Sequence, residues 1–254
     1  MTAKGSATIA VIGGTGMNQW PGLEILHKHR AATPYGEPSA PIVYGRIHGV
    51  EVAFLARHGE GHKLPPHLIN YRANLYALKD DGIRGVIAIA AVGGIAKNLP
   101  PAAVAVPEDL IDYTYGREHT YSDGAHAPLR HVDLSAPYAP RLRKVLLASA
   151  RKAKVKLVDG GVMGVTQGPR LESPAEIRRM KRDGCTMVGM TGMPEAALAR
   201  ELGLEYATIA VVANYAAGKG DSAHAIPLDK IGAVLEESMG RVRRVIETLC
   251  EQAA

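Results

Sequence analysis

Residues 85–94 read GVIAIAAVGG, an unbroken apolar run over 85–92 that is followed by two glycines. Such a run is typical of a strand buried on both faces, because a half-exposed strand alternates apolar with polar residues. Short runs rich in Val, Ile and Ala recur at 7–12, 50–56, 161–165, 187–190 and 206–213. Longer amphipathic stretches alternate with them. This alternation predicts one α/β domain over residues 1–254, with a mostly parallel or mixed sheet.

Three stretches predict helices that can be checked residue by residue. Ser173 is followed by Pro174 and Glu176, which is the order of a capping box with proline at the first helical position. Apolar residues keep helical spacing through 231–249, the clearest helix of the chain. One helical face is also predicted to hold four residues: Leu68, Tyr71, Leu75 and Leu78.

The positive net charge of the chain raises the question of whether the protein binds nucleic acid. The net charge is +5 and the pI is about 9.2. However, the positive charges at 141–156 and 178–182 recur at helical spacing, which is typical of solvated helix faces. The chain holds one Phe and one Trp, so few rings are present to stack on bases, although ten Tyr remain. We expect no nucleic-acid partner.

Cysteine content and hydropathy bear on location. Cys185 and Cys250, the two cysteines of the chain, show neither metal spacing nor a disulfide pattern. This fits a reducing compartment. No apolar run reaches membrane-spanning length, and 8–12 is too short for a signal sequence. The sequence predicts a soluble cytoplasmic protein without a membrane partner.

The first two strand ends carry groups suited to an anion. Ligands of open α/β sheets bind at the carboxyl ends of the strands. The glycines of 13–16 expose backbone N–H donors to an anion, and Thr15 adds a hydroxyl. The alternative interpretation of this segment is a tight structural turn. Arg57 then offers a forked donor for phosphate, and His58 could donate a further bond. A metal set of His58, His62 and His67 lacks a matching Asp or Cys and is disfavoured.

Later strand ends supply groups for a planar ligand. The glycines of 91–94 expose backbone donors or allow close packing. Glu172, beside apolar Leu171, could present a carboxylate to a planar ligand. Alternatively, it is an acid at the start of a helix, where the helix macrodipole favours negative charge. Asn214 carries a donor and an acceptor that can read a purine edge, or it forms a turn.

Residues 190–195 form one more strand-to-helix turn. Core packing is the usual role of a methionine such as Met190, and Glu195 is predicted to be a first-turn helix acid. Each cluster alone is a modest signal. Together they place anion donors and one amide at several strand ends, which is the pattern of a composed small-molecule site.

These clusters, in this order, resemble the trimeric purine nucleoside phosphorylase and 5′-methylthioadenosine phosphorylase family. The resemblance runs over nearly the whole chain and is carried by 12–16, 55–62, 70–78, 91–94, 107–114, 168–172 and 189–214. Within the family, the chain is most similar to the branch that acts on S-methyl-5′-thioinosine. The resemblance implies a mixed sheet partly closed into a barrel and flanked by helices. It also implies a homotrimer that needs no cofactor and uses inorganic phosphate as co-substrate.

The resemblance also implies roles for individual residues. Phosphate would be held by Thr15, Arg57, His58, the backbone at Ala91, and Thr191. Purine and ribose would be held by Val92, Gly93, Leu171, Glu172, Asn214 and Met190, whose backbone would bond a ribose hydroxyl. The 5′ pocket would be completed by Leu228, Ile231 and a neighbouring subunit's copy of His131. The implied catalytic residues are Asn214, Glu172 and His58.

Substrate preference follows from a few of these positions. Adenine-using relatives typically carry Asp where this chain has Asn214, and a second Asp where it has Ala216. An Asn can donate to a 6-oxo group while Glu172 accepts from N1–H, so a 6-oxopurine is favoured. Leu228 offers no polar partner for a 5′-hydroxyl, which favours a methylthio group. The chain departs from the family pattern at Ala90, usually Asn or Thr, and at Leu171, usually aromatic.

The resulting expectation is a pentosyltransferase of purine salvage. It would split S-methyl-5′-thioinosine with phosphate into hypoxanthine and 5-methylthioribose 1-phosphate. Close alternatives are a 5′-methylthioadenosine phosphorylase and a general purine nucleoside phosphorylase. A hydrolase that uses water and a non-catalytic nucleoside-binding protein are alternatives of other classes. The glycine turn at 13–16 has the wrong spacing for a dinucleotide-dependent dehydrogenase.

Overall fold

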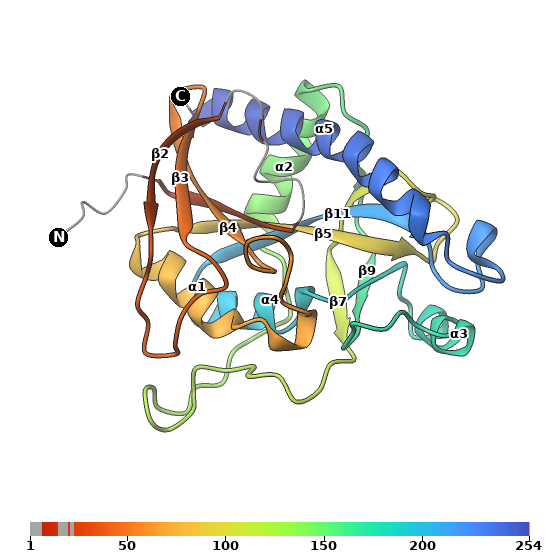
Figure 1. Cartoon of the computed structure of the whole chain (residues 1–254), viewed down its shortest axis with the longest axis horizontal. Coiled ribbons are helices and arrows are strands. Elements are labelled where there is room, and N and C mark those ends of the chain that lie inside the picture. Colours follow the sequence, from red (N-terminus) through yellow and green to blue (C-terminus); the bar gives the residue numbers. More distant parts are fainter. Residues whose placement is uncertain (1–6, 15–19, 21–22, 254) are drawn as a thin grey trace.

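The structure is a computed structural model that describes residues 7–14, 20 and 23–253. Its eleven described strands form a single mixed sheet flanked by helices (Figure 1). The strands are β1 (Ile9–Gly13), β2 (Glu24–His29), β3 (Ile42–Ile47), β4 (Val50–Ala56), β5 (Gly85–Gly94), β6 (Val104–Val106), β7 (Asp109–Asp112), β8 (Val158–Asp159), β9 (Val162–Val165), β10 (Met187–Gly189) and β11 (Glu205–Tyr215).

Five α-helices and two short 3-10 helices complete the described part of the chain. The α-helices are α1 (Tyr71–Asp80), α2 (Pro140–Lys152), α3 (Pro174–Arg182), α4 (Gly192–Glu201) and α5 (Leu228–Ala253). The 3-10 helices are η1 (Pro66–Leu68) and η2 (Gly220–Ser222).

The sheet branches at β5. This strand pairs in parallel with β1 and with β11, and its last two residues pair antiparallel with β10. Gly94 sits at this branch, where a Cβ atom would overlap the carbonyl oxygen of Leu99, so only glycine fits. The main strand order is β2-β3-β4-β1-β5-β10-β9-β7, and no pairing between described residues of β2 and β7 joins its ends. The expected mixed sheet is confirmed, but it is not closed.

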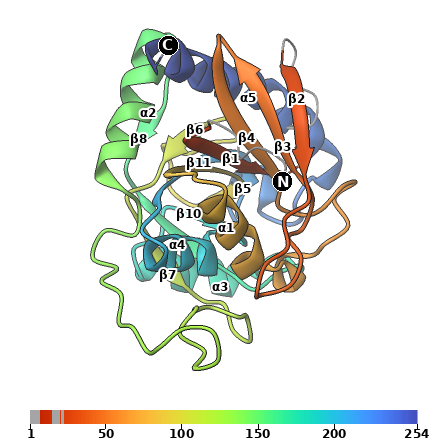
Figure 2. The same ribbon diagram turned by 90° about the vertical axis from the view of Figure 1, so that its left-hand side faces the viewer.

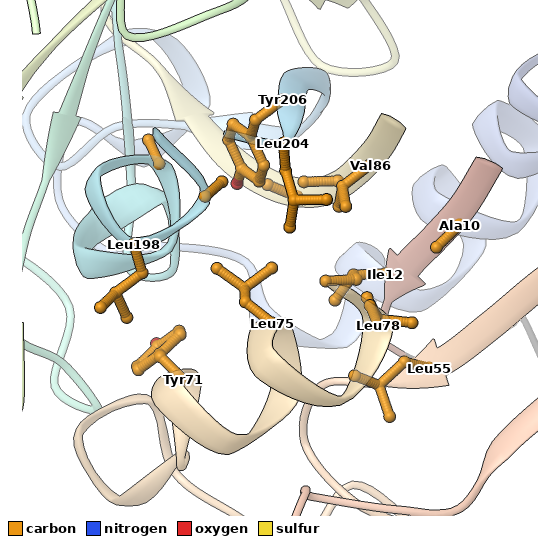
Figure 3. Packing of buried hydrophobic residues seen from close by; sticks show 14 of the residues in the cluster. Ala10, Ile12, Leu55, Tyr71, Leu75, Leu78, Val86, Leu198, Leu204 and Tyr206 are labelled. Atoms are coloured by element: carbon orange, nitrogen blue, oxygen red, sulfur yellow. The ribbon is translucent and has the colours of Figure 1, made fainter. Parts of the chain in front are cut away.

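Helices cover both faces of the sheet. α2 and α5 lie on one side and α1 and α4 on the other (Figure 1, Figure 2). Because successive strand residues point to opposite faces, Val11 packs beneath α2 and α5 while Ile12 packs against α1. Figure 3 shows Leu75 and Leu78 of α1 in the same core as Ile12. The central strands β1, β5 and β11 are thus buried on both sides, as their unbroken apolar runs predict.

The predicted helices are largely confirmed. Ser173 caps α3, and its side chain and that of Glu176 exchange hydrogen bonds with each other's backbone, forming the expected capping box. Leu68 is an exception, because it lies in η1 and is 63% exposed. The side chain of Asn70 accepts a hydrogen bond from the backbone of Ala73, so α1 starts only after this cap.

The described residues contain neither a membrane-spanning helix nor a metal-binding cluster of side chains. None of these helices combines the length and hydrophobicity needed to cross a bilayer. Within the same residues, no three His, Cys, Asp or Glu side chains gather in a way that could hold a metal ion.

Candidate active site

A cavity of about 790 Å³ opens at the carboxyl ends of the parallel strands β1, β4, β5 and β11. This volume suits a small organic ligand. Ala91 is exposed although it lies within the central strand β5, because it forms part of the cavity wall. The predicted residues that line the cavity are Arg57, His58, Ala91, Val92, Gly93, Leu171, Glu172, Met190, Thr191, Asn214 and Ile231.

Three predicted residues are not among them. Thr15 lies outside the described residues. His131 is exposed in the irregular segment before α2 and does not line this chain's cavity. Leu228 is 63% exposed at the start of α5, so the prediction that it closes the cavity is wrong for the single chain. The apolar wall instead consists of Ile226, Ile231, Leu235 and Met239.

Arg57 is held in a buried ion pair with Glu195. The guanidinium is 2% exposed and Glu195 is fully buried. Nε and Nη2 of Arg57 donate to the two carboxylate oxygens of Glu195 at 2.8 and 2.9 Å. Tyr206 also donates its hydroxyl proton to Glu195, at 2.8 Å. Burial opposes the charge of Arg57, but the attraction and hydrogen bonds of Glu195 outweigh it and raise the pKa of Arg57 above its usual value.

This pair corrects the prediction of a free guanidinium fork for phosphate. Two further donations, to the carbonyls of Ile89 and Ile12, leave one N–H of Nη1 without an acceptor among the described residues. Arg57 lines the cavity, so one N–H rather than a fork remains for a ligand. Glu195 does lie in the first turn of α4, but its main contacts are with Arg57 and Tyr206.

His58 lies at the same end of the cavity as a neutral ring. Its Nδ1 is 2.8 Å from the carbonyl oxygen of Leu64. A carbonyl only accepts, so the ring proton is on Nδ1. Burial, together with the nearby Arg57 and His62, lowers the pKa of His58 to about 4. The one N–H of the neutral ring is used in the bond to Leu64, so this form of His58 has no second N–H to donate. The predicted contact of His58 with phosphate stays a prediction.

The lowered pKa of His58 predicts an acid sensitivity. The free side chain has a pKa of about 6.5, so between about pH 6.5 and 4 the unfolded chain binds a proton that the folded chain excludes. The contribution of His58 to stability is complete above about pH 6.5 and is lost as the pH falls toward 4. We expect the melting temperature to fall less between pH 7 and pH 4.5 in His58→Gln than in the unchanged protein. Equal falls in both proteins would contradict this assignment.

The cavity wall also presents an acid and an amide. Thr166 donates its hydroxyl proton to Oε1 of Glu172 at 2.6 Å, which leaves Oε2 for a ligand. Nδ2 of Asn214 donates to the carbonyl oxygen of Tyr215 at 2.6 Å, which leaves Oδ1 and one N–H. Both Glu172 and Asn214 are 9% exposed and line the cavity. The fixed orientation of each group gives this part of the wall a defined set of donors and acceptors.

A bulge in β11 brings Asn214 to this wall. Val212 pairs with Val92 and Asn214 pairs with Gly93, so Ala213 is the extra residue. With regular alternation, Ala213 and Asn214 would point to opposite faces. Both line the cavity because the bulge changes the direction of the strand.

Comparison with known proteins agrees with this geometry. The sequence profile described as "Phosphorylase superfamily" matches residues 8–251. The chain belongs to the Phosphorylase superfamily. It is 54% identical over 220 residues to a protein of Xanthomonas campestris pv. campestris named "Probable S-methyl-5'-thioinosine phosphorylase", covering 87% of this chain and 88% of the relative. It is 44% identical over 215 residues to a Pyrococcus furiosus protein named "6-oxopurine nucleoside phosphorylase", covering 83% of this chain and 80% of the relative.

Solved structures of the superfamily share the fold. A methylthioadenosine phosphorylase of Schistosoma mansoni in complex with adenine has a TM-score of 0.90 and 29% identity, covering 97% of this chain and 92% of the other. A methylthioadenosine phosphorylase from an antarctic soil metagenomic library has a TM-score of 0.88 and 35% identity, covering 96% and 85%.

In this member of the Phosphorylase superfamily, Arg117 is a supporting residue that the sequence analysis missed. Its side chain donates to four backbone carbonyl oxygens and also contacts the side chains of Tyr71 and Gln167. The four carbonyls belong to Thr166, Gln167, Met190 and Met193. Burial lowers the pKa of Arg117 from its usual value.

These bonds tie together two loops of the site. One loop carries Thr166, which orients Glu172, and the other carries Met190 and Thr191. The carbonyl of Met190 accepts from Arg117 at 2.9 Å, which fixes the backbone of this residue at the cavity wall.

Proposed function

We propose that this protein splits a 5′-methylthio purine nucleoside, S-methyl-5′-thioinosine, with inorganic phosphate. The products are hypoxanthine and 5-methylthioribose 1-phosphate, so the protein is a pentosyltransferase of purine salvage. The observation that carries the proposal is one cavity whose wall combines a cation and a hydroxyl with an acid and an amide. Arg57, His58 and Thr191 line it together with Glu172 and Asn214.

The reaction exchanges one bond for another at the anomeric carbon. The bond between this carbon and N9 of the purine breaks, and its electron pair leaves with the base. A phosphate oxygen then bonds the same carbon, and the base takes up a proton. Positive charge on the sugar and negative charge on the base develop on the way. Phosphate faces the first charge, while Asn214 and Glu172 stabilise the second through the purine edge.

The groups at the base end support a 6-oxopurine. An N–H of Asn214 is available for a 6-oxo oxygen, and Oε2 of Glu172 is available for the N1–H of the same base. The apolar wall of Ile226, Ile231 and Met239 supports a methylthio rather than a hydroxyl group at the 5′ position, because it offers that group no polar partner. The name of the 54% identical relative points the same way.

Two alternatives remain. A 5′-methylthioadenosine phosphorylase is favoured by the names of the structural neighbours. A nucleoside-binding protein would bind the same ligands without turnover. One assay separates them: S-methyl-5′-thioinosine, 5′-methylthioadenosine and inosine are each incubated with and without phosphate. We expect phosphate-dependent release of hypoxanthine from S-methyl-5′-thioinosine at the highest kcat/KM. Release without phosphate would indicate a hydrolase, and binding without release would overturn the proposal.

We further propose a homotrimer in which His131 reaches a neighbouring subunit's cavity. His131 lies away from the cavity of its own chain, near Leu129, which is 78% exposed. We also place the protein in the cytoplasm, which is supported by two cysteines that are both free and buried.

A further inference from the structure

The loop after β9 turns back on itself and brings Glu172 beside Thr166. Thr166 directly follows Val165, the last residue of β9, and Glu172 lies just before the cap of α3. Gly168, between them, has a φ of 60°, in the left-handed region. A Cβ atom at Gly168 would also lie 2.5 Å from Sδ of Met190, so the turn favours glycine on both counts. The turn leaves the side chains of Thr166 and Glu172 within hydrogen-bond distance.

The main chain of Thr166 is fixed without help from its side chain. Its backbone N–H donates to the carbonyl oxygen of Gly189 in β10 at 2.8 Å. Its carbonyl oxygen accepts from Nη2 of Arg117 at 3.2 Å, and three further carbonyls hold the same guanidinium. Thr166 does not line the cavity. A change confined to its side chain is therefore not expected to move the loop.

The hydroxyl of Thr166 is committed to Glu172. It has one proton and two acceptors within reach, Oε1 of Glu172 at 2.6 Å and the carbonyl oxygen of Gly189 at 3.3 Å. The shorter contact, to a charged acceptor, is the stronger bond, and the carbonyl of Gly189 already accepts from the backbone. Among the described residues, this hydroxyl is the one hydrogen-bond donor to the carboxylate of Glu172.

The cation nearest to Glu172 in the sequence is engaged elsewhere. Arg170 donates Nη1 and Nη2 to the two carboxylate oxygens of Glu176, at 2.9 and 2.7 Å. The side chain of Arg170 is also 71% exposed, so water screens its attraction for Glu172. The orientation of Glu172 therefore depends on Thr166, whose bond to Oε1 leaves Oε2 as an acceptor at the cavity wall.

We propose that Thr166 sets the preference of the base site for a 6-oxopurine over a 6-aminopurine, by holding Glu172 as a fixed acceptor. N1 of a 6-oxopurine carries a proton, whereas N1 of a 6-aminopurine carries a lone pair. A carboxylate that cannot turn away disfavours the second base, because two acceptors then face each other without a proton. Thr166 is a positioning residue, since it acts through Glu172. The inference rests on the proposed function, whose base selection it explains.

The test measures the binding of two free bases to the full chain. Calorimetry in the presence of phosphate gives the dissociation constants of adenine and hypoxanthine, and the first divided by the second is the oxo preference. Thr166→Val keeps the shape of the side chain but loses the donor, so we expect the oxo preference to fall about tenfold. Thr166→Ser keeps the hydroxyl and should stay within about threefold of the unchanged protein. Because both bases are measured on one preparation, a partly unfolded variant does not alter this ratio.

Two further variants separate positioning from a structural role. Thr186→Val removes a hydroxyl that bonds the backbone of Val162 in β9 at 3.1 and 3.2 Å, and it should keep the oxo preference. In Glu172→Ala the group on which Thr166 acts is gone, so adding Thr166→Val should change the oxo preference by less than about twofold. A purely structural effect of Thr166→Val would persist in that background.

The outcomes separate this inference from the proposed function. An unchanged oxo preference in Thr166→Val refutes the role of Thr166 and leaves the proposed function in place. A fall in Thr166→Ser as large as that in Thr166→Val refutes it as well, because the hydroxyl would not be the cause. If Thr166→Val lowers the oxo preference but the unchanged protein cleaves no nucleoside with phosphate, the proposed function fails while the role of Thr166 stands.

Discussion

Changing Glu195 to glutamine is expected to lower the free energy of unfolding by about 3–5 kcal/mol and to raise the KM for phosphate. The cause is Arg57, which would keep its buried charge without a carboxylate partner, and removing one partner of a buried pair typically costs this much. Glutamine also cannot receive both Nε and Nη2 of Arg57 as the carboxylate does. The guanidinium would shift, and with it the one N–H left for a ligand.

The experiment has a matched control. Glu205 forms an ion pair with Arg141 through two contacts, but the side chain of Arg141 is 75% exposed. The same change, Glu205→Gln, should cost less than about 1 kcal/mol, because exposed pairs contribute little. Urea unfolding gives the stabilities, and phosphate titration at saturating nucleoside separates KM from kcat. If Glu195→Gln unfolds at the same urea concentration as Glu205→Gln, the buried pair does not have the role described.

Removing the amide of Asn214 is expected to lower the rate of base release by about 100-fold. Loss of one well-placed donor to developing charge typically has this effect. The loss in Asn214→Ala should appear in kcat for the nucleoside, while the KM for phosphate should change little, because Asn214 lies at the base end of the cavity. Asn98→Ala serves as control, since Asn98 is exposed and does not line the cavity. A near-normal kcat in Asn214→Ala would refute its role.

A second substitution at Asn214 tests base selection. Asn214→Asp replaces a donor by an acceptor, so preference should shift from 6-oxo toward 6-amino purines in the substrate panel. Adding the second aspartate that adenine-using relatives carry, Ala216→Asp, is expected to destabilise the protein. Ala216 is 1% exposed and packs among Ile95 and Val188 at the wall of the cavity, where a carboxylate would lose most of its hydration. Unchanged selectivity in Asn214→Asp would refute the assignment of the base.

The sequence predicts the central strands better than the edge of the sheet. β4 begins and ends as predicted at 50–56, and β5 extends the predicted strand by two residues, because strands buried on both faces need continuous apolar runs. β2 reads EILHKH and leaves Ile25 60% exposed, so its sequence carries no such signal. An edge strand pairs on one side only and tolerates this composition.

The residues of the site likewise divide into those that a local sequence signal predicts and those whose role depends on a contact with a residue far away in the sequence. Glu172 and Asn214 could be predicted because each follows a strand, and strand ends meet at one edge of a parallel sheet. The partner of Arg57 could not, because Glu195 lies 138 residues away and its position also suits an ordinary helix acid. Its one local signal is an acid within the apolar stretch 193–199. Arg117 lies in an irregular segment, where nothing local distinguishes it from a surface arginine.

The way Arg117 makes its bonds has a consequence for how the substrate range of such an enzyme can change. Arg117 donates hydrogen bonds to backbone carbonyls of the loops at 166–167 and 190–193, and every amino acid has this carbonyl. Apart from Gln167, whose side chain Arg117 also contacts, side chains on these loops can therefore be exchanged without loss of these bonds. Mutation can vary the chemistry of the sugar and base walls over a constant main-chain frame, so new specificities are open to selection while the catalytic alignment is inherited unchanged.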